Sequence, residues 1–188
     1  MERTDVIVYM GDITEPMIGR LMDCTLQAKR NGSSGIHLHI SSSGGNIATG
    51  FAAYYHLRSL GIPLVAHNIG DVASVAMLPF LAADTRLAGL HTCFLFHGVC
   101  GTRAVNTIDI RDTREVLRHY EHYASRYAAL FDARTQRKFN IRDYIIDGNT
   151  SRMPAQVGFE KGITTEQGTS DPVIPEGAVL WSITPNTI

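Results

Sequence analysis

The sequence predicts a single α/β domain organised around a mainly parallel sheet. Its 188 residues suffice for one domain of ordinary size, and 44% of them are hydrophobic. In the first half of the chain, short apolar runs rich in β-branched residues alternate with stretches of helical periodicity. This alternation is typical of βαβ units, in which helices connect parallel strands.

The first half contains the expected sheet and its covering helices. Apolar runs predict strands at residues 6–10, 36–40, 63–69 and 92–97. Apolar residues at helical spacing predict helices at residues 14–30, 47–60 and 75–83. Turns rich in small residues separate strand from helix at residues 41–46 and 70–74.

The second half is dominated by one long expected helix, residues 106–138. Apolar residues recur there with helical spacing among Arg, Glu, His and Tyr. Such a striped helix needs a partner surface, in its own domain or in another subunit, because packing rather than propensity stabilises most helices. Shorter helices are expected at residues 141–146 and 154–161, with a turn at Gly148-Asn149 between them.

Composition excludes several classes of function. A formal net charge of -1 with 19% charged residues favours neither disorder nor nucleic acid as a partner. Cys24, Cys93 and Cys100 lack CxxC spacing, which argues against a disulfide framework or zinc site, and we expect no cofactor. Without a signal-like N-terminus or a long apolar stretch, the expected location is the cytoplasm, with no membrane partner.

Three motifs follow expected strands, at the edge where open α/β sheets bind their ligands. Ser43-Gly44-Gly45 is either a tight turn or a loop whose N–H groups stabilise an anion. Ser74 is either an N-cap of the following helix or a nucleophile. His97 is either a core histidine satisfied by backbone groups or a general base.

Together the three motifs supply the components of acyl transfer to serine. The hydroxyl must lose its proton to a base whose pKa is near neutral, and the tetrahedral oxyanion must find N–H donors. We therefore predict Ser74 as the nucleophile and His97 as the general base of a hydrolase. The N–H groups of Gly45 and Val75 are the expected oxyanion donors.

A resemblance to a known family rests on segments that extend over nearly the whole chain. These segments are Ile40 to Asn46, Ile69 to Val75, Leu95 to His97, Met153 to Gln156 and Glu160 to Ile163. In order and spacing they look like the proteolytic subunit of the Clp protease, a ClpP-like serine peptidase of family S14. The resemblance implies a ClpP/crotonase-like β-α superhelix with a protruding helical handle. It divides the single domain 1–188 into a head, about 1–103 and 150–188, and a handle, about 104–149.

The resemblance also implies an activity and partners. Members are serine-type endopeptidases that hydrolyse peptides or unfolded proteins through an acyl-enzyme, and their nucleophile and base map onto Ser74 and His97. Their oxyanion donors map onto Gly45 and Val75. The handle implies self-assembly into heptameric or tetradecameric rings that enclose the active sites. An AAA+ unfoldase is the implied partner, although the family segment that meets it has no counterpart before Glu2.

The sequence departs from the family at the third member of the triad. Thr150 stands where the family has an Asp, and Asn149 and Asp147 are neighbouring alternatives. A neutral oxygen holds the imidazole tautomer but stabilises the imidazolium less than a carboxylate does, so impaired activity is expected. The alternative function is a weak or inactive subunit with a structural or regulatory role in a mixed ring. A crotonase-type acyl-CoA enzyme is a third hypothesis, and the sequence lacks an obvious catalytic Glu pair for it.

Overall fold

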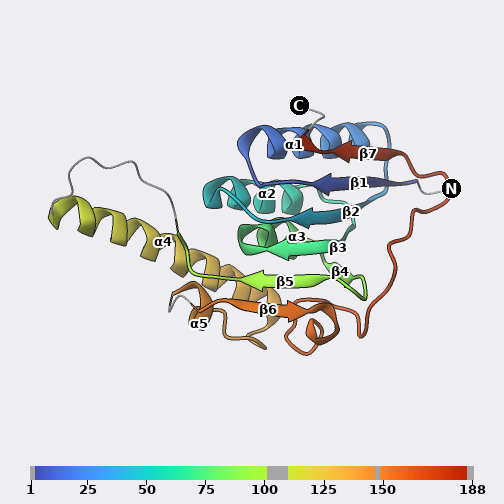
Figure 1. Ribbon diagram of the computed structural model, residues 1–188. Coiled ribbons are helices and arrows are strands. Elements are labelled where there is room, and N and C mark those ends of the chain that lie inside the picture. Colours follow the sequence, from blue (N-terminus) through green and yellow to red (C-terminus); the bar gives the residue numbers. More distant parts are fainter. Residues whose placement is uncertain (1–2, 101–109, 147–148, 186–188) are drawn as a thin grey trace.

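A seven-stranded sheet forms the centre of the computed structural model, which describes residues 3–100, 110–146 and 149–185 (Figure 1). The strand order is β6-β5-β3-β2-β1-β7, and β4 pairs with β3 beside this path. The paired strands are parallel except β5 and β6, which are antiparallel. The strands are β1 (Thr4–Met10), β2 (Gly35–Ser42), β3 (Leu64–Ala73), β4 (Thr85–Ala88), β5 (Cys93–Phe96), β6 (Ser151–Pro154) and β7 (Leu180–Ile183).

Three helices follow the first three strands and pack side by side along the sheet (Figure 1). They are α1 (Glu15–Arg30), α2 (Ile47–Ser59) and α3 (Met77–Ala82). Side-chain caps begin two of them: the Thr14 hydroxyl accepts from the Met17 N–H, and the Asn46 amide oxygen accepts from the Thr49 N–H. These caps fix where the chain turns from strand edge into helix.

The helix α4 (Ile110–Thr135) extends away from the sheet (Figure 1). Its C-terminal half is buried in the core, with Tyr127 4% exposed and Phe131 fully buried. Its N-terminal half is largely exposed and includes Leu117, which is 56% exposed. Apolar side chains on both halves explain the stripe in the sequence, although among the described residues the buried positions of α4 fall in its C-terminal half. A short helix, α5 (Arg142–Ile145), follows.

The structure confirms the predicted α/β class and corrects several elements. Residues 70–73, expected as a turn, continue β3, because β5 pairs there with residues Asp71 to Ala73. The helix expected at 154–161 is instead the end of β6 followed by the 3-10 turn η2 (Ala155–Val157). The strands β4, β6 and β7 were not predicted, since their four residues include polar ones and lack the continuous apolar run that marks the equally short β5.

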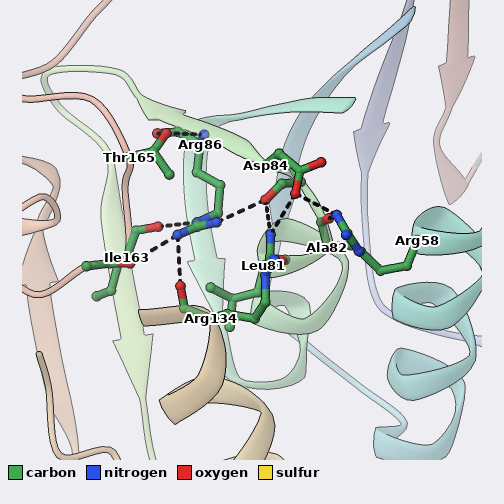
Figure 2. A network of polar contacts seen from close by, with 10 residues as sticks. Arg58, Leu81, Ala82, Asp84, Arg86, Arg134, Ile163 and Thr165 are labelled. Carbon is green, nitrogen blue, oxygen red and sulfur yellow. Dashed lines mark hydrogen bonds and ion pairs between the residues drawn. The ribbon is translucent and has the colours of Figure 1, made fainter. Parts of the chain in front are cut away.

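Buried Arg86 joins the sheet to α4 and to the C-terminal part of the chain (Figure 2). The residue is 4% exposed. Its guanidinium donates hydrogen bonds to the carbonyls of Ala83, Arg134, Gly162 and Ile163. Burial, and then the neighbouring Arg134, lowers the pKa of Arg86 to about 10, so the group stays charged at neutral pH. The carbonyls replace the water that a buried cation loses.

None of the helices in the described ranges combines the length and the apolar character that a membrane span requires.

Candidate active site

A cavity of about 550 Å³ lies where the ends of β3 and β5 meet the glycine loop and α4. Four of the five predicted site residues line it: Gly45, Ser74, Val75 and His97. They come from three separate segments, each of which follows a strand of the sheet. The predicted convergence of strand-end motifs on one site is therefore observed for these four residues.

Ser74 occupies a strained turn between strand and helix. It follows β3 directly, begins the 3-10 turn η1 (Ser74–Ala76) and has a φ of 53°. The left-handed region is unfavourable for residues other than Gly, and it persists only where the surroundings hold it. Strained strand-to-helix turns are a recurrent way of exposing a nucleophilic hydroxyl. The helix α3, which contains Pro79, begins directly after η1.

The Gly44-Gly45 loop lies against Ser74. Gly44 has a φ of 103°, and a Cβ on it would lie 2.8 Å from the Ser74 Cβ. Ile13 straps the loop from the other side: its N–H donates to the Gly44 carbonyl at 2.7 Å, and its carbonyl accepts from Asn46 at 2.9 Å. Neither of these two hydrogen bonds involves the Gly45 N–H, which is the predicted oxyanion donor.

Ser43 helps to hold the same loop. Its hydroxyl donates to the Asp12 carboxylate. This bond ties the loop to the segment between β1 and α1. A side-chain hydrogen bond thus helps to restrain the backbone of this loop.

His97 is held through its Nδ1 atom, which lies 2.7 Å from the Gly98 carbonyl oxygen. A carbonyl only accepts, so Nδ1 is the protonated nitrogen, and Nε2 of the neutral ring carries the lone pair that a base needs. In the described part of the chain, no hydrogen bond joins His97 to the Ser74 hydroxyl. Catalytic hydrogen bonds in ligand-free enzymes are often long and tighten when substrate binds.

Thr150 lies one residue before β6, and His97 lies one residue after β5. The antiparallel β5–β6 ladder ends with the pair of Phe96 and Ser151, so continuing its register by one residue would set His97 opposite Thr150. Thr150 is exposed and is not one of the described residues that line the cavity. Of the alternatives, Asn149 donates to the Asp143 carbonyl at 2.9 Å, and Asp147 lies outside the described residues.

The helix α4 contributes a wall that the site prediction did not include. His119, Tyr120, Tyr123 and Tyr127 line the cavity, and the rings of His119 and Tyr123 lie 4.8 Å apart. The Tyr127 hydroxyl donates to the Ser74 carbonyl at 2.9 Å. The apolar stripe of the predicted helix contained these tyrosines. Helical periodicity signals a buried face but gives no information on which strand end that face contacts.

Comparison with known proteins identifies the family and the fold of the chain. The model of the Clp protease family matches residues 1–153, and the chain belongs to that family, whose members are ClpP-like peptidases. The structure of a ClpP1 point mutant from Listeria monocytogenes superposes with a TM-score of 0.70 at 20% identity, and the match covers 90% of this chain and 92% of that one. This likeness confirms the ClpP-like fold. No curated protein matches the sequence.

Proposed function

We propose that this protein is a serine-type endopeptidase that hydrolyses peptides or unfolded proteins through an acyl-enzyme on Ser74. The observation that carries the proposal is that Ser74, His97, Gly45 and Val75 line one cavity, with Ser74 in a strained turn. The family supplies the reaction class, and the cavity supplies a serine, an imidazole and backbone donors in one place.

In the proposed mechanism, Ser74 Oγ attacks the scissile carbonyl carbon while His97 Nε2 takes the hydroxyl proton. The oxyanion accepts from the N–H groups of Gly45 and Val75. The C–N bond then breaks, and the imidazolium gives its proton to the leaving amine. The same imidazole deprotonates a water molecule, which cleaves the ester and restores the Ser74 hydroxyl. The role assigned to Thr150 is to support the imidazole from the β6 side.

The test is labelling of purified protein with a fluorophosphonate probe, read by intact mass. We expect one adduct on the wild type and none on Ser74→Ala, because the probe forms its bond to an activated serine oxygen. We expect His97→Ala to lose labelling as well, since the proposed base would no longer take the hydroxyl proton. Labelling of Ser74→Ala equal to the wild type would refute the assignment of the nucleophile.

A weak or inactive subunit of a mixed ring is the second candidate function. Two observations favour it: no hydrogen bond joins Ser74 to His97 in the described part of the chain, and the His97 Nδ1 atom faces the neutral Gly98 carbonyl. A carbonyl orients the ring but adds no negative charge to stabilise the imidazolium. Absence of labelling in the wild type, both alone and mixed with an active Clp protease subunit, would select this function.

We also propose that the chain assembles into heptameric or tetradecameric rings through the exposed half of α4. Leu117 is 56% exposed there, and burial between subunits would remove its apolar surface from water. Leu117→Glu is expected to lower the mass measured by light scattering. Leu26→Glu, a change at an exposed leucine of α1 (38% exposed), is the matched control and should leave that mass unchanged. Binding of an AAA+ unfoldase would be tested separately, by its effect on degradation of an unfolded protein.

A further inference from the structure

Tyr127 connects α4 to the backbone of the proposed nucleophile. Its hydroxyl donates to the Ser74 carbonyl at 2.9 Å, and the residue is 4% exposed. Burial raises the pKa of Tyr127 well above its ordinary value, so the hydroxyl keeps its proton in any working pH range. A carbonyl offers no proton in return, which makes Tyr127 a permanent donor at this position.

The Tyr127 ring is itself fixed by aromatic contacts. It stacks on Phe131 with centroids 6.3 Å apart, and Phe131 meets Phe96 edge to face at 5.7 Å. Phe96 ends β5 and directly precedes His97. One aromatic cluster therefore holds the donor of the Ser74 carbonyl and the strand that carries the base.

The Ser74 carbonyl is held from two directions. The Met77 N–H donates to it from within the turn, and the Tyr127 hydroxyl donates to it from α4. A carbonyl oxygen has two lone pairs, so these two donors satisfy it. The direction of this carbonyl sets the plane of the peptide bond that follows Ser74. The two donors therefore help to hold the backbone of the turn in which Ser74 has a φ of 53°.

A second residue of α4 bonds to the C-terminal end of the segment that begins at Ser74. Arg134 lies two helical turns beyond Tyr127, on the same face of α4. Its guanidinium donates to the carbonyls of Leu81 and Ala83 at 2.8 and 2.7 Å, at the C-terminus of α3 (Figure 2). The helix α4 thus bonds to both ends of the segment that runs from Ser74 to Ala83.

We propose that Tyr127 is a positioning residue, whose hydrogen bond keeps the Ser74 turn in the conformation that presents the Ser74 hydroxyl to the cavity. This inference rests on the proposed role of Ser74 as the nucleophile. Tyr127 acts on the orientation of the serine, because its hydroxyl is bonded to the Ser74 backbone. Its removal should slow bond formation at Ser74 and leave binding in the cavity almost unchanged.

The test is Tyr127→Phe, which keeps the ring and removes the donor. We expect the maximal rate of fluorophosphonate labelling to fall about five- to tenfold, the effect of one lost hydrogen bond. The probe's half-saturating concentration should change less than twofold, and the fraction of folded protein should equal that of the wild type. Tyr144→Phe is the matched control, because Tyr144 belongs to the same aromatic cluster without lining the cavity. An unchanged labelling rate in folded Tyr127→Phe overturns the proposal.

A crystal structure of Tyr127→Phe gives a readout that does not depend on activity. We expect the Ser74 carbonyl to rotate away from its position and the Ser74 φ to leave the left-handed region. If the wild type is not labelled, the proposed nucleophile fails, and this structure still decides the positioning role. A Ser74 backbone unchanged from the wild type would show that Tyr127 does not hold the turn.

Discussion

Thr150 is the single residue whose replacement should most increase activity. It directly precedes β6, and continuing the β5–β6 register by one residue would set it opposite His97, where a carboxylate would add charge near the imidazole. We expect Thr150→Asp to raise the rate of labelling and of peptide hydrolysis by about tenfold or more. Asn has nearly the same shape as Asp but no charge, so Thr150→Asn should leave both rates near the wild type. An equal rise in the two variants would exclude a charge effect.

Gly44 tests how closely the loop must approach the nucleophile. A Cβ there would lie 2.8 Å from the Ser74 Cβ and 3.0 Å from the Ala73 carbonyl oxygen, so the loop or the serine must move. We expect Gly44→Ala to abolish labelling of Ser74 and to lower the free energy of unfolding by about 1 to 3 kcal/mol. Chemical denaturation and intact mass measure the two effects.

Gly19 provides the contrasting glycine. It lies within α1, and a Cβ there would meet nothing within 4 Å. Gly19→Ala should therefore raise the free energy of unfolding by about 0.5 to 1 kcal/mol and leave labelling unchanged, because Ala loses less conformational freedom in a helix. A loss of stability in Gly19→Ala would contradict our explanation, in which the space around the added Cβ and the backbone φ determine the effect of each Gly→Ala change.

At the residue scale, the sequence could predict the groups that follow strands but not their partners. Ser74, His97 and Gly45 each come after a strand, and parallel topology brings such positions to one edge. Tyr127 lies in the middle of a helix, and its contact with the Ser74 carbonyl depends on how α4 folds back across the sheet edge. Periodicity cannot supply that packing arrangement.

At the element scale, β3 shows why strand boundaries were hard to predict. Its first half pairs with β4 at Val65 to Asn68, and its second half pairs with β5 at Asp71 to Ala73. Gly70 and Asp71 are typical turn residues, yet tertiary pairing keeps them in a strand. The loop geometry that delivers Ser74 to the cavity therefore begins only after Ala73.

Arg86 makes a prediction about how these elements are joined. Arg86→Met would remove four hydrogen bonds to carbonyls in separate segments of the chain, and of these carbonyls the one of Ala83 keeps a bond from Arg134. We expect a loss of about 3 kcal/mol or more in the free energy of unfolding measured with urea. Arg58→Met is the control, because it breaks an ion pair with Asp84, whose side chain is 64% exposed, and should cost about 1 kcal/mol or less. Similar losses in both variants would contradict the assigned role of Arg86.

At the scale of the whole molecule, a group of histidines lies between the sheet and the segment before β7. His39 and His67 pair across β2 and β3, with ring centroids 5.9 Å apart. The His67 Nε2 atom donates to the Ser170 carbonyl at 2.9 Å, and His37 bonds to the backbone of Val173. Asp171 lies on the same segment, and its charge raises the pKa of His67.

Burial determines how these histidines titrate. It lowers the pKa of His39 to about 4, with further lowering by His67 and His37. Burial also lowers the pKa of His37 and of His67, and outweighs Asp171, which raises the pKa of His67. The folded protein therefore binds fewer protons than the unfolded chain, so stability is lost as the pH falls below the ordinary pKa of 6.5.

Acidification should consequently destabilise this region between about pH 6.5 and 4. We expect the free energy of unfolding to fall with a slope of up to about 1.4 kcal/mol per pH unit for each histidine that titrates. His39→Gln should show a shallower slope than the wild type. His91→Gln, at an exposed histidine, should keep the wild-type slope. Identical slopes in all three proteins would show that the buried histidines do not control acid stability.

The place of β7 has a consequence for how the chain folds during synthesis. The strand β1 lies between β2 and β7, so one side of the first strand pairs with residues Val179 to Ile183, near the other end of the chain. Trp181 also donates to the fully buried Asp5, beside the ion pair with Arg3. A ribosome needs roughly 10 to 30 s to add the intervening residues. During that interval the β1 edge offers unpaired backbone groups to chaperones or to neighbouring nascent chains.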